Sequence, residues 1–584
     1  MKKLTMSMGL LLAAPVVFAG NLDVVSVGPG VGCDYATIQE GIDNSNEISL
    51  HVTNTQIFRE NLELSGLSDL NIVGGFDNCS DAESGVAGVN GYTIISGDLD
   101  DDGVGEAAVM QIEGEGNISL RNFQIVEGLE EFSPFGHNGG GLSLLNYEGG
   151  LNLDSMYIAN NQGHVGGGIS INGGDVELEI NDNVLIVGNL ATQNGGGIWC
   201  RGSNEIIFKD NAIESGVAVN TSQVDGGGVY LMSDCSLSMS QGRFQPLDGD
   251  FRGIAKNKAN RHGGGVYMAS GAQLALVGNN NSVVNVSDNI ADDDAQDGGD
   301  GGGIYATGEN TLISASNVYI GNNTAVLGGG VRLGEAAVLF MARTSKQCWN
   351  QKHCNLFSFN VAGAAGAIYA ENESGFLVTG AVFEDNRAQI ATTVFVNSES
   401  IGVLGSSVVS HNGRGGINGF ADLALMGADD GSILRLGFNT ITDNDVFTSV
   451  ISAGSTQPVE LQLVGNIIHN DENDIPVATL ADNTVATSNC MILHELNSLN
   501  GTDLTSEDPL FVNPELRDYH LQEDSPAIDR CSTDDSGNLT DMDHEAYGWD
   551  DPFATGEAPM TADIGADETY ISDVIFKNSF EELL

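Results

Sequence analysis

The short acidic run at residues 98–106 is the strongest candidate for metal chemistry in the sequence. Asp98, Asp100 and Asp102 alternate along it and a glycine follows them, which is the pattern that opens calcium-binding loops. Glu106 is a fourth acidic candidate, but Val109 stands where an EF-hand has its last carboxylate, so the run is not an EF-hand. Two interpretations stay open: a calcium loop held by these four side chains, or an acidic surface turn.

A second candidate lies just before a recurring glycine triplet. His137 and His164 occupy the same position relative to two successive triplets. If the repeats stack in register, these side chains lie about 5 Å apart, close enough to share a metal ion or a ligand. Elsewhere the same position holds residues such as Val224 and Val326, which favours a variable turn surface over a site.

Proton abstraction from a uronate sugar needs a basic side chain and usually a divalent cation. The densest group of bases is Arg252, Lys256, Lys258 and Arg261, for which a solvated turn is the simpler interpretation. No Gly-x-Ser-x-Gly, His-Glu-x-x-His or phosphate-loop pattern occurs. The sequence therefore identifies no catalytic residue.

These candidates are carried by a repeat whose most regular part is the glycine triplet followed by Leu, Ile or Val. Successive triplets begin 27 to 38 residues apart, and such a period indicates a stacked repeat architecture. The triplets stand at 139–141, 166–168, 195–197, 226–228, 263–265, 301–303 and 328–330, with a degenerate copy at 365–367. Glycine permits positive φ and close backbone approach, so each triplet predicts a tight corner.

A second repeat consists of an apolar residue, two variable positions and an asparagine. Asparagine tolerates the left-handed conformation, and its amide can bond to identical residues in the coils above and below. The predicted column comprises Asn160, Asn189, Asn211, Asn257, Asn289, Asn322, Asn360, Asn386, Asn412, Asn444 and Asn470.

Together the two repeats predict an all-β, right-handed, single-stranded parallel β-helix solenoid over residues 106–475. Residues 20–105 are expected to form an N-terminal cap and the first coils, with a short amphipathic helix over residues 33–42. A propeller would need longer and more uniform blades, and the leucine-rich repeat pattern is missing.

The motif pair "FxxN" and "GG[AGI][ILV]" resembles the polymorphic outer-membrane protein repeats of the pectin-lyase-like, right-handed β-helix superfamily. Phe383-Glu384-Asp385-Asn386 and Phe208-Lys209-Asp210-Asn211 match the first motif literally. This resemblance implies the fold, but that superfold includes both lyases and non-enzymatic surface proteins.

Residues 476–570 resemble the choice-of-anchor Q end region of secreted bacterial β-helix proteins. The resemblance rests on Asp508-Pro509-Leu510-Phe511-Val512, Asp518-Tyr519-His520-Leu521, Ser525-Pro526-Ala527-Ile528-Asp529 and Asp563-Ile564-Gly565-Ala566-Asp567-Glu568, in that order. The C-terminal tail, 571–584, is similar to a short terminal motif of some exported proteobacterial proteins.

Residues 1–19 read as a secretory signal peptide, with Lys2 and Lys3 before an apolar run that ends at Ala19. No segment is long enough to be a transmembrane span. The eight cysteines fit an oxidising compartment, and neighbour-first pairing favours four structural disulfides. These are Cys33–Cys79, Cys200–Cys235, Cys348–Cys354 and Cys490–Cys531.

The formal net charge of −59 argues against nucleic acid as a partner, since nucleic acid binds cationic faces. We therefore expect an exported, extracellular or cell-surface protein, associated with the outer membrane if it is anchored. Its expected role is non-enzymatic: structural, adhesive or binding, with an extended glycan or a surface protein as the partner. The alternative is a polysaccharide lyase or glycoside hydrolase. On this interpretation the glycine triplets are scaffold, because the residues before them form no consistent catalytic column.

Overall fold

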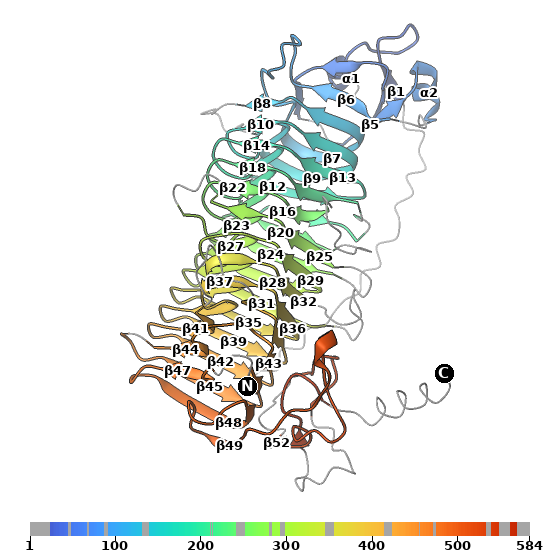
Figure 1. Ribbon diagram of the computed structural model, residues 1–584. Coiled ribbons are helices and arrows are strands. Elements are labelled where there is room, and N and C mark those ends of the chain that lie inside the picture. The colour runs from blue at the N-terminus through green and yellow to red at the C-terminus, as the bar shows by residue number, and fades with distance from the viewer. Residues whose placement is uncertain are drawn as a thin grey trace, which may run out of the picture.

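The computed structural model describes residues 24–44, 48–66, 69–86, 91–130, 139–210, 212, 214–240, 252–278, 283–292, 298–344, 355–413, 423–454, 456–470, 475–532, 539–547 and 561–568. Figure 1 shows these residues as a long rod of stacked coils, with β48 (Val485–Leu493) and β49 (Thr502–Thr505) at the C-terminal end. The main sheet has 41 strands, and the two antiparallel pairs among the described residues lie outside it. The predicted all-β parallel β-helix is confirmed.

One coil contains three longer strands and a short one. After the triplet at 195–197 these are β15 (Ile198–Arg201), β16 (Glu205–Phe208), β17 (Gly216–Ala218) and β18 (Thr221–Ser222). They pair in parallel with β19 (Val229–Met232), β20 (Ser236–Met239), β21 (Gly253–Ala255) and β22 (Lys258–Ala259) of the next coil. Alternate side chains point inward, so Ile198 and Cys200 are fully buried in a core that follows the rod.

The glycine triplets form the predicted corners. Gly263 has φ +66°, in the left-handed region. A Cβ on Gly264 would lie 2.5 Å from the carbonyl carbon of Ile290 and 2.6 Å from the carbonyl oxygen of Gly302 in the next coil. Successive corners therefore stack backbone against backbone, with no room for a side chain.

The asparagines form a continuous ladder of buried amides. The Oδ1 of Asn289 accepts hydrogen bonds from the backbone N–H and the Nδ2 of Asn257, at 3.0 and 3.1 Å. Its own Nδ2 donates to Oδ1 of Asn323 and to the carbonyl of Ile254, both at 3.0 Å. The members are Asn161, Asn189, Asn220, Asn257, Asn289, Asn323, Asn360, Asn386, Asn412, Asn444 and Asn470.

Three predicted positions of this column differ from the observed ladder. Asn160 and Asn322 adopt left-handed backbone conformations, and the residue after each of them, Asn161 or Asn323, is the ladder member. Asn211 lies outside the described residues, and Asn220 fills its coil's place in the ladder.

The N-terminal end of the rod carries two short helices, α1 (Ile38–Asn44) and α2 (Cys79–Ser84). Helix α1 begins later than the predicted range 33–42. The carboxylate of Glu60 accepts the backbone N–H groups of Ile38 and Gln39, both at 3.0 Å, and so fixes where the first turn starts. The coils already begin at β1 (Val24–Val27), and the main sheet continues through β49, beyond residue 475.

Three of the predicted disulfides are present: Cys33–Cys79, Cys200–Cys235 and Cys490–Cys531. Cys348 and Cys354, the fourth predicted pair, lie outside the described residues, as do the predicted signal peptide at 1–19 and the tail at 571–584. The three bridges are compatible with an oxidising, extracellular compartment.

The C-terminal region folds back onto one flank of the rod. Its described elements are β50 (Phe511–Asn513), η1 (Pro514–Leu516), β51 (Asp518–Leu521), β52 (Cys531–Ser532) and β53 (Thr561–Ala562). Arg517 pairs with Glu384 and Asp385 at 2.6 and 3.0 Å, and the Tyr519 hydroxyl donates to Asp443 at 2.9 Å. The region is therefore tied to several coils at once.

A dense acidic cluster lies inside this C-terminal region. Burial lowers the pKa of His520, but its contacts with Asp518, Asp543 and Asp567 outweigh burial and raise that pKa to about 10. Burial raises the pKa of Asp541 to about 8, and the charges of Asp567, Asp543 and Glu545 act in the same direction. Arg343, which interacts electrostatically with Asp541 and Asp543, contributes a positive charge.

Both shifts predict that the C-terminal region loses stability as the pH rises. The stabilisation from His520 is complete below its ordinary pKa of 6.5 and disappears as the pH passes about 10. Asp541 keeps its proton in the folded protein up to about pH 8, whereas in the unfolded chain it loses it near 3.8, so its cost to folding grows as the pH rises and is complete at about pH 8. Thermal unfolding at pH 6.5 and 9.5 should show a lower transition temperature at pH 9.5. Asp541→Asn should flatten this dependence, whereas replacing the exposed Glu515 by glutamine should leave it unchanged.

Candidate functional site: an outward column of aromatic residues around Arg332

The second residue after each glycine corner points away from the core. Tyr230 is typical, because Val229 and Leu231 on either side of it are fully buried inside the rod. Equivalent residues pair in register through successive coils and form what we call the outer column. It comprises Trp199, Tyr230, Tyr267, Tyr305, Arg332, Tyr369 and Phe395.

Three tyrosines at the centre of the outer column stack on one another. The ring centroids of Tyr230 and Tyr267 are 4.7 Å apart and those of Tyr267 and Tyr305 are 5.1 Å apart, with interplanar angles of 6°. This spacing matches the distance of about 4.8 Å between neighbouring strands. The ring faces cover each other, so the ring edges and hydroxyl groups form the outer surface, and all three side chains remain partly exposed.

Arg332 takes the place of an aromatic residue in the outer column. Its guanidinium carbon lies 4.8 Å from the ring centroid of Tyr305 and 5.7 Å from that of Tyr369, and the residue is only 6% exposed. A guanidinium between two tyrosine rings gains from cation–π attraction when it is desolvated. Arg332 therefore continues the stack and adds a buried positive charge to it.

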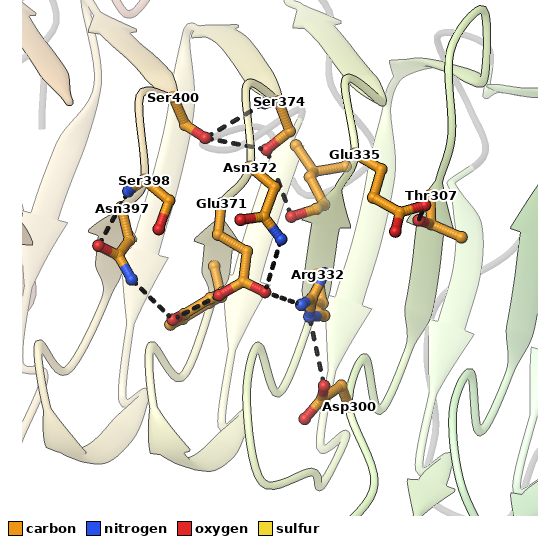
Figure 2. A network of polar contacts seen from close by, with 12 residues as sticks. Asp300, Thr307, Arg332, Glu335, Glu371, Asn372, Ser374, Asn397, Ser398 and Ser400 are labelled. Carbon is orange, nitrogen blue, oxygen red and sulfur yellow. Dashed lines mark hydrogen bonds and ion pairs between the residues drawn. The ribbon is translucent and has the colours of Figure 1, made fainter. Parts of the chain in front are cut away.

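Two carboxylates flank this guanidinium, as Figure 2 shows. Nε of Arg332 lies 3.3 Å from Oδ2 of Asp300, and Nη2 binds Oε1 of Glu371. The Tyr369 hydroxyl donates to Oε2 of Glu371 at 3.0 Å, and Nδ2 of Asn372 donates to Oε1 at 3.3 Å. The strands that position them are β30 (Val331–Gly334) and β34 (Ile368–Ala370), while Asp300 precedes β27 (Ile304–Thr307).

The two carboxylates differ in their exposure to solvent and in their neighbours. Burial raises the pKa of Asp300 to about 6; the positive charge of Arg332 opposes this shift and Glu371 adds to it. The side chain of Asp300 is 15% exposed and that of Glu371 is 20% exposed. Asp300 is therefore a carboxyl group that exchanges its proton close to neutral pH.

Polar side chains lie beside the aromatic column, within the two residues before the triplets that begin at Gly226, Gly263 and Gly301. Arg261 pairs with Asp225 at 2.6 Å, and the backbone N–H of Asp300 donates to Nδ1 of His262 at 3.2 Å. The His262 ring also stacks on Tyr305, with centroids 4.8 Å apart. Burial lowers the pKa of His262, and the charges of Arg261 and Arg332 lower it further, so the ring is neutral at neutral pH.

The histidine pair expected from the sequence remains a prediction, because His137 lies outside the described residues. Nδ1 of His164 lies 3.4 Å from the hydroxyl of Thr192. The four bases at 252–261 do not form one cationic patch. Arg252 pairs with Glu214, which lies between β16 and β17, whereas Arg261 pairs with Asp225, which follows β18.

The predicted calcium loop follows β6 (Thr93–Ser96). Oxygens of Asp98, Asp100 and Asp102 lie within 4.8 Å of one another. Asp98 is buried, and its carboxylate accepts the backbone N–H groups of Asp102 and Gly103 at 3.1 and 2.9 Å. Burial acts to raise its pKa, but these amides and the nearby guanidinium of Arg59 lower it overall.

The fourth predicted ligand of this loop, Glu106, binds the loop's own backbone. Its Oε2 accepts the N–H of Leu99 at 2.7 Å. Three converging carboxylates suit a hard cation such as calcium, which prefers oxygen ligands.

The sequence did contain a signal for the outer column. Counting two residues beyond the last glycine gives Ser143 and Ser170 for the first two triplets. The later triplets give Trp199, Tyr230, Tyr267, Tyr305, Arg332 and, after the degenerate copy, Tyr369. The positions before the triplets give no such signal, because valines interrupt the polar residues there.

No family model matches the chain, and no curated protein matches it. Within the described ranges, no helix is long and apolar enough to cross a membrane.

Proposed function

We propose that this protein is an exported, non-enzymatic β-helix that binds an extended polysaccharide along the outer column. The observation that carries the proposal is the in-register row of Tyr230, Tyr267 and Tyr305, which continues into Arg332. A partner with regularly repeated hydroxyl groups suits a surface that repeats polar groups once per coil, and solenoid faces bind extended partners.

The geometry of the row determines which atoms contact the ligand. Because the rings stack on each other, hydrogen bonds from the phenol hydroxyls contribute more than contact with ring faces. Carboxylates of Asp225, Asp300 and Glu371 lie beside the row and add acceptors for sugar hydroxyls. Export is supported by the predicted signal peptide, the disulfides and the resemblance of the C-terminal region to choice-of-anchor Q segments.

The test removes three hydroxyls while keeping the rings. The triple variant Tyr230→Phe, Tyr267→Phe and Tyr305→Phe should bind polysaccharide at least about tenfold more weakly, since each hydrogen bond contributes about 0.5–1.5 kcal/mol. Affinity is measured by gel-shift electrophoresis and calorimetry over a polysaccharide panel. Tyr157→Phe, on another strand, is the matched control and should bind normally. Equal binding by the triple variant, or no binding by the wild type, would refute the proposal.

A second candidate function, glycoside hydrolysis, is favoured by one observation. Asp300, with a pKa of about 6, and Glu371 are two carboxyl groups beside one guanidinium, and glycosidases use a protonated and an ionised carboxyl group. A lyase is less favoured, because Arg332 is paired with both carboxylates and is a poor base. Release of reducing ends that is abolished by Asp300→Asn would establish hydrolysis in place of simple binding.

We also propose that Asp98, Asp100 and Asp102, with Glu106 closing the loop, bind calcium. The bound ion would stabilise the first coils, because Arg59 from β3 (Ile57–Arg59) contacts the same loop. It has no proposed part in ligand binding.

Chelation tests this calcium loop. At calcium concentrations 10 to 100 times the Kd, the ion should stabilise the fold by about 1–3 kcal/mol, so chelator should lower the transition temperature. Asp100→Ala should lower it equally and abolish the response to chelator. Asp101→Asn is the control, because Asp101 lies in the same loop but outside the converging group. The transition temperature of this variant should still fall when chelator is added. If neither chelator nor Asp100→Ala changes the transition temperature, the loop is an acidic surface turn and does not bind calcium.

A further inference from the structure

The surroundings of Arg332 carry information about the charge of the ligand. Between Tyr230 and Phe395, four carboxylates lie beside the outer column: those of Asp225, Asp300, Glu335 and Glu371. Among the described residues that interact with these carboxylates, only Arg261 and Arg332 carry a permanent positive charge. The His262 ring is neutral. The column is therefore net negative.

Both guanidinium groups are already engaged. Arg261 is paired with Asp225, and Arg332 is held between Asp300 and Glu371. Arg332 is also almost completely buried, so its guanidinium holds the two carboxylates in place and does not bind an incoming anion. A uronate carboxylate would meet fixed negative charge here, and like-charge contact across an interface strongly disfavours binding.

The same arrangement suits hydroxyl donors. An ionised carboxylate has about four acceptor positions, and that of Asp300 accepts one hydrogen bond, from the backbone N–H of Leu327, beside its ion pair with Arg332. Oε2 of Glu371 accepts one hydrogen bond, from Tyr369. Bonds from sugar hydroxyls to such carboxylates are charge-assisted and stronger than neutral ones. Two nitrogens of the buried Arg332, Nε and Nη1, have no hydrogen-bond partner in the described part of the chain, which further marks this as a polar site that the described side chains do not complete.

We propose that Asp300 and Glu371, fixed by Arg332, bind one uncharged sugar unit and select uncharged polysaccharides over uronate-containing ones. This inference rests on the proposed function, because it names the ligand class of the same outer column. Arg332 acts as a positioning residue, and the two carboxylates contact the ligand.

The experiment compares polymers that share a backbone and differ at C6: mannan with polymannuronate, and a glucan with its C6-oxidised form. The wild type should bind the uncharged member of the preferred pair at least tenfold more tightly. The double variant Asp300→Asn, Glu371→Gln should bind that member at least fivefold more weakly. The ratio of its affinities for the uncharged and the uronate polymer should also be smaller than in the wild type. Glu335→Gln, which removes one charge outside the arginine-linked pair, should retain most of the affinity.

Salt provides a measurement that needs no variant. Because the discrimination is electrostatic, raising the salt concentration should improve binding of the uronate polymer and leave the uncharged one nearly unchanged. The inference would be overturned if the wild type preferred the uronate polymer, or if the folded double variant kept the selectivity of the wild type. In either case weaker binding by the phenylalanine triple variant would still support the outer column as the binding surface. Failure to bind any polymer would instead refute the proposed function.

Discussion

Asn323→Ala should destabilise the rod by about 3–6 kcal/mol, because it leaves several buried hydrogen-bonding groups without partners, each costing about 1–3 kcal/mol. Oδ1 of Asn323 accepts both the N–H and the Nδ2 of Asn289, at 3.0 Å each. Its Nδ2 donates to Oδ1 of Asn360 and to the carbonyl of Val286, both at 3.0 Å. All of these groups are in the interior, where water does not replace the lost bonds. Urea titration followed by circular dichroism measures the change.

The adjacent asparagine is the matched control. Asn322 is exposed and has φ +55°, so Asn322→Gly keeps the backbone conformation and removes an amide outside the ladder. Its effect should stay below about 1 kcal/mol, apart from the entropy that glycine adds to the unfolded chain. Similar losses for the two variants would contradict the observed register of the ladder.

Gly264→Ala should cost about 3 kcal/mol or more, since a methyl group there overlaps backbone atoms that cannot rotate away. Its Cβ would lie 2.5 Å from the carbonyl carbon of Ile290 and 2.6 Å from the oxygen of Gly302. Relief requires the following coil to move away from this corner, which breaks the parallel hydrogen bonds between the two. We expect a large drop in the denaturation midpoint, or failure to fold.

Gly437→Ala adds the same methyl group where there is room. Its nearest neighbours would be side-chain carbons of Leu539 and Val464, at 3.8 and 3.9 Å, which is ordinary van der Waals contact. A small change or a slight gain in stability is expected. A loss at Gly437 equal to that at Gly264 would mean that added side-chain bulk, and not the corner geometry, determines the cost.

The fold was predictable because two of its constraints are local. Glycine is favoured at a corner whose first residue has positive φ and whose second touches the next coil, so the triplets mark these corners directly. The register of the asparagine ladder was less accessible. The ladder asparagine stands three residues after an inward apolar side chain, such as Ile158 before Asn161 and Ile320 before Asn323. Counting from the outward Tyr157 and Tyr319 instead placed both asparagines one residue too early.

The site was less predictable for a different physical reason. Asp300, Arg332 and Glu371 lie 32 and 39 residues apart in sequence, and coil lengths vary, so no fixed period brings them together. Their contact follows from pairing between coils and from side-chain conformations that a sequence does not show. The calcium candidates were recognisable because they lie within one loop, whose local spacing is preserved on folding.

The asparagine ladder also bears on how such a protein changes length over generations. Its ends are closed by groups of other kinds: the N–H of Gly128 binds Asn161 at 2.9 Å, and Nδ1 of His494 accepts the N–H of Asn470 at 3.3 Å. Every rung from Asn189 to Asn412 donates its backbone N–H and its Nδ2 to the next asparagine and accepts the same two bonds from the previous one. Duplicating or deleting the segment from one rung to the next, such as 290–323, therefore changes the rod by about 4.8 Å without creating a new type of contact. Unequal recombination of the gene can therefore lengthen or shorten the rod by one coil at a time.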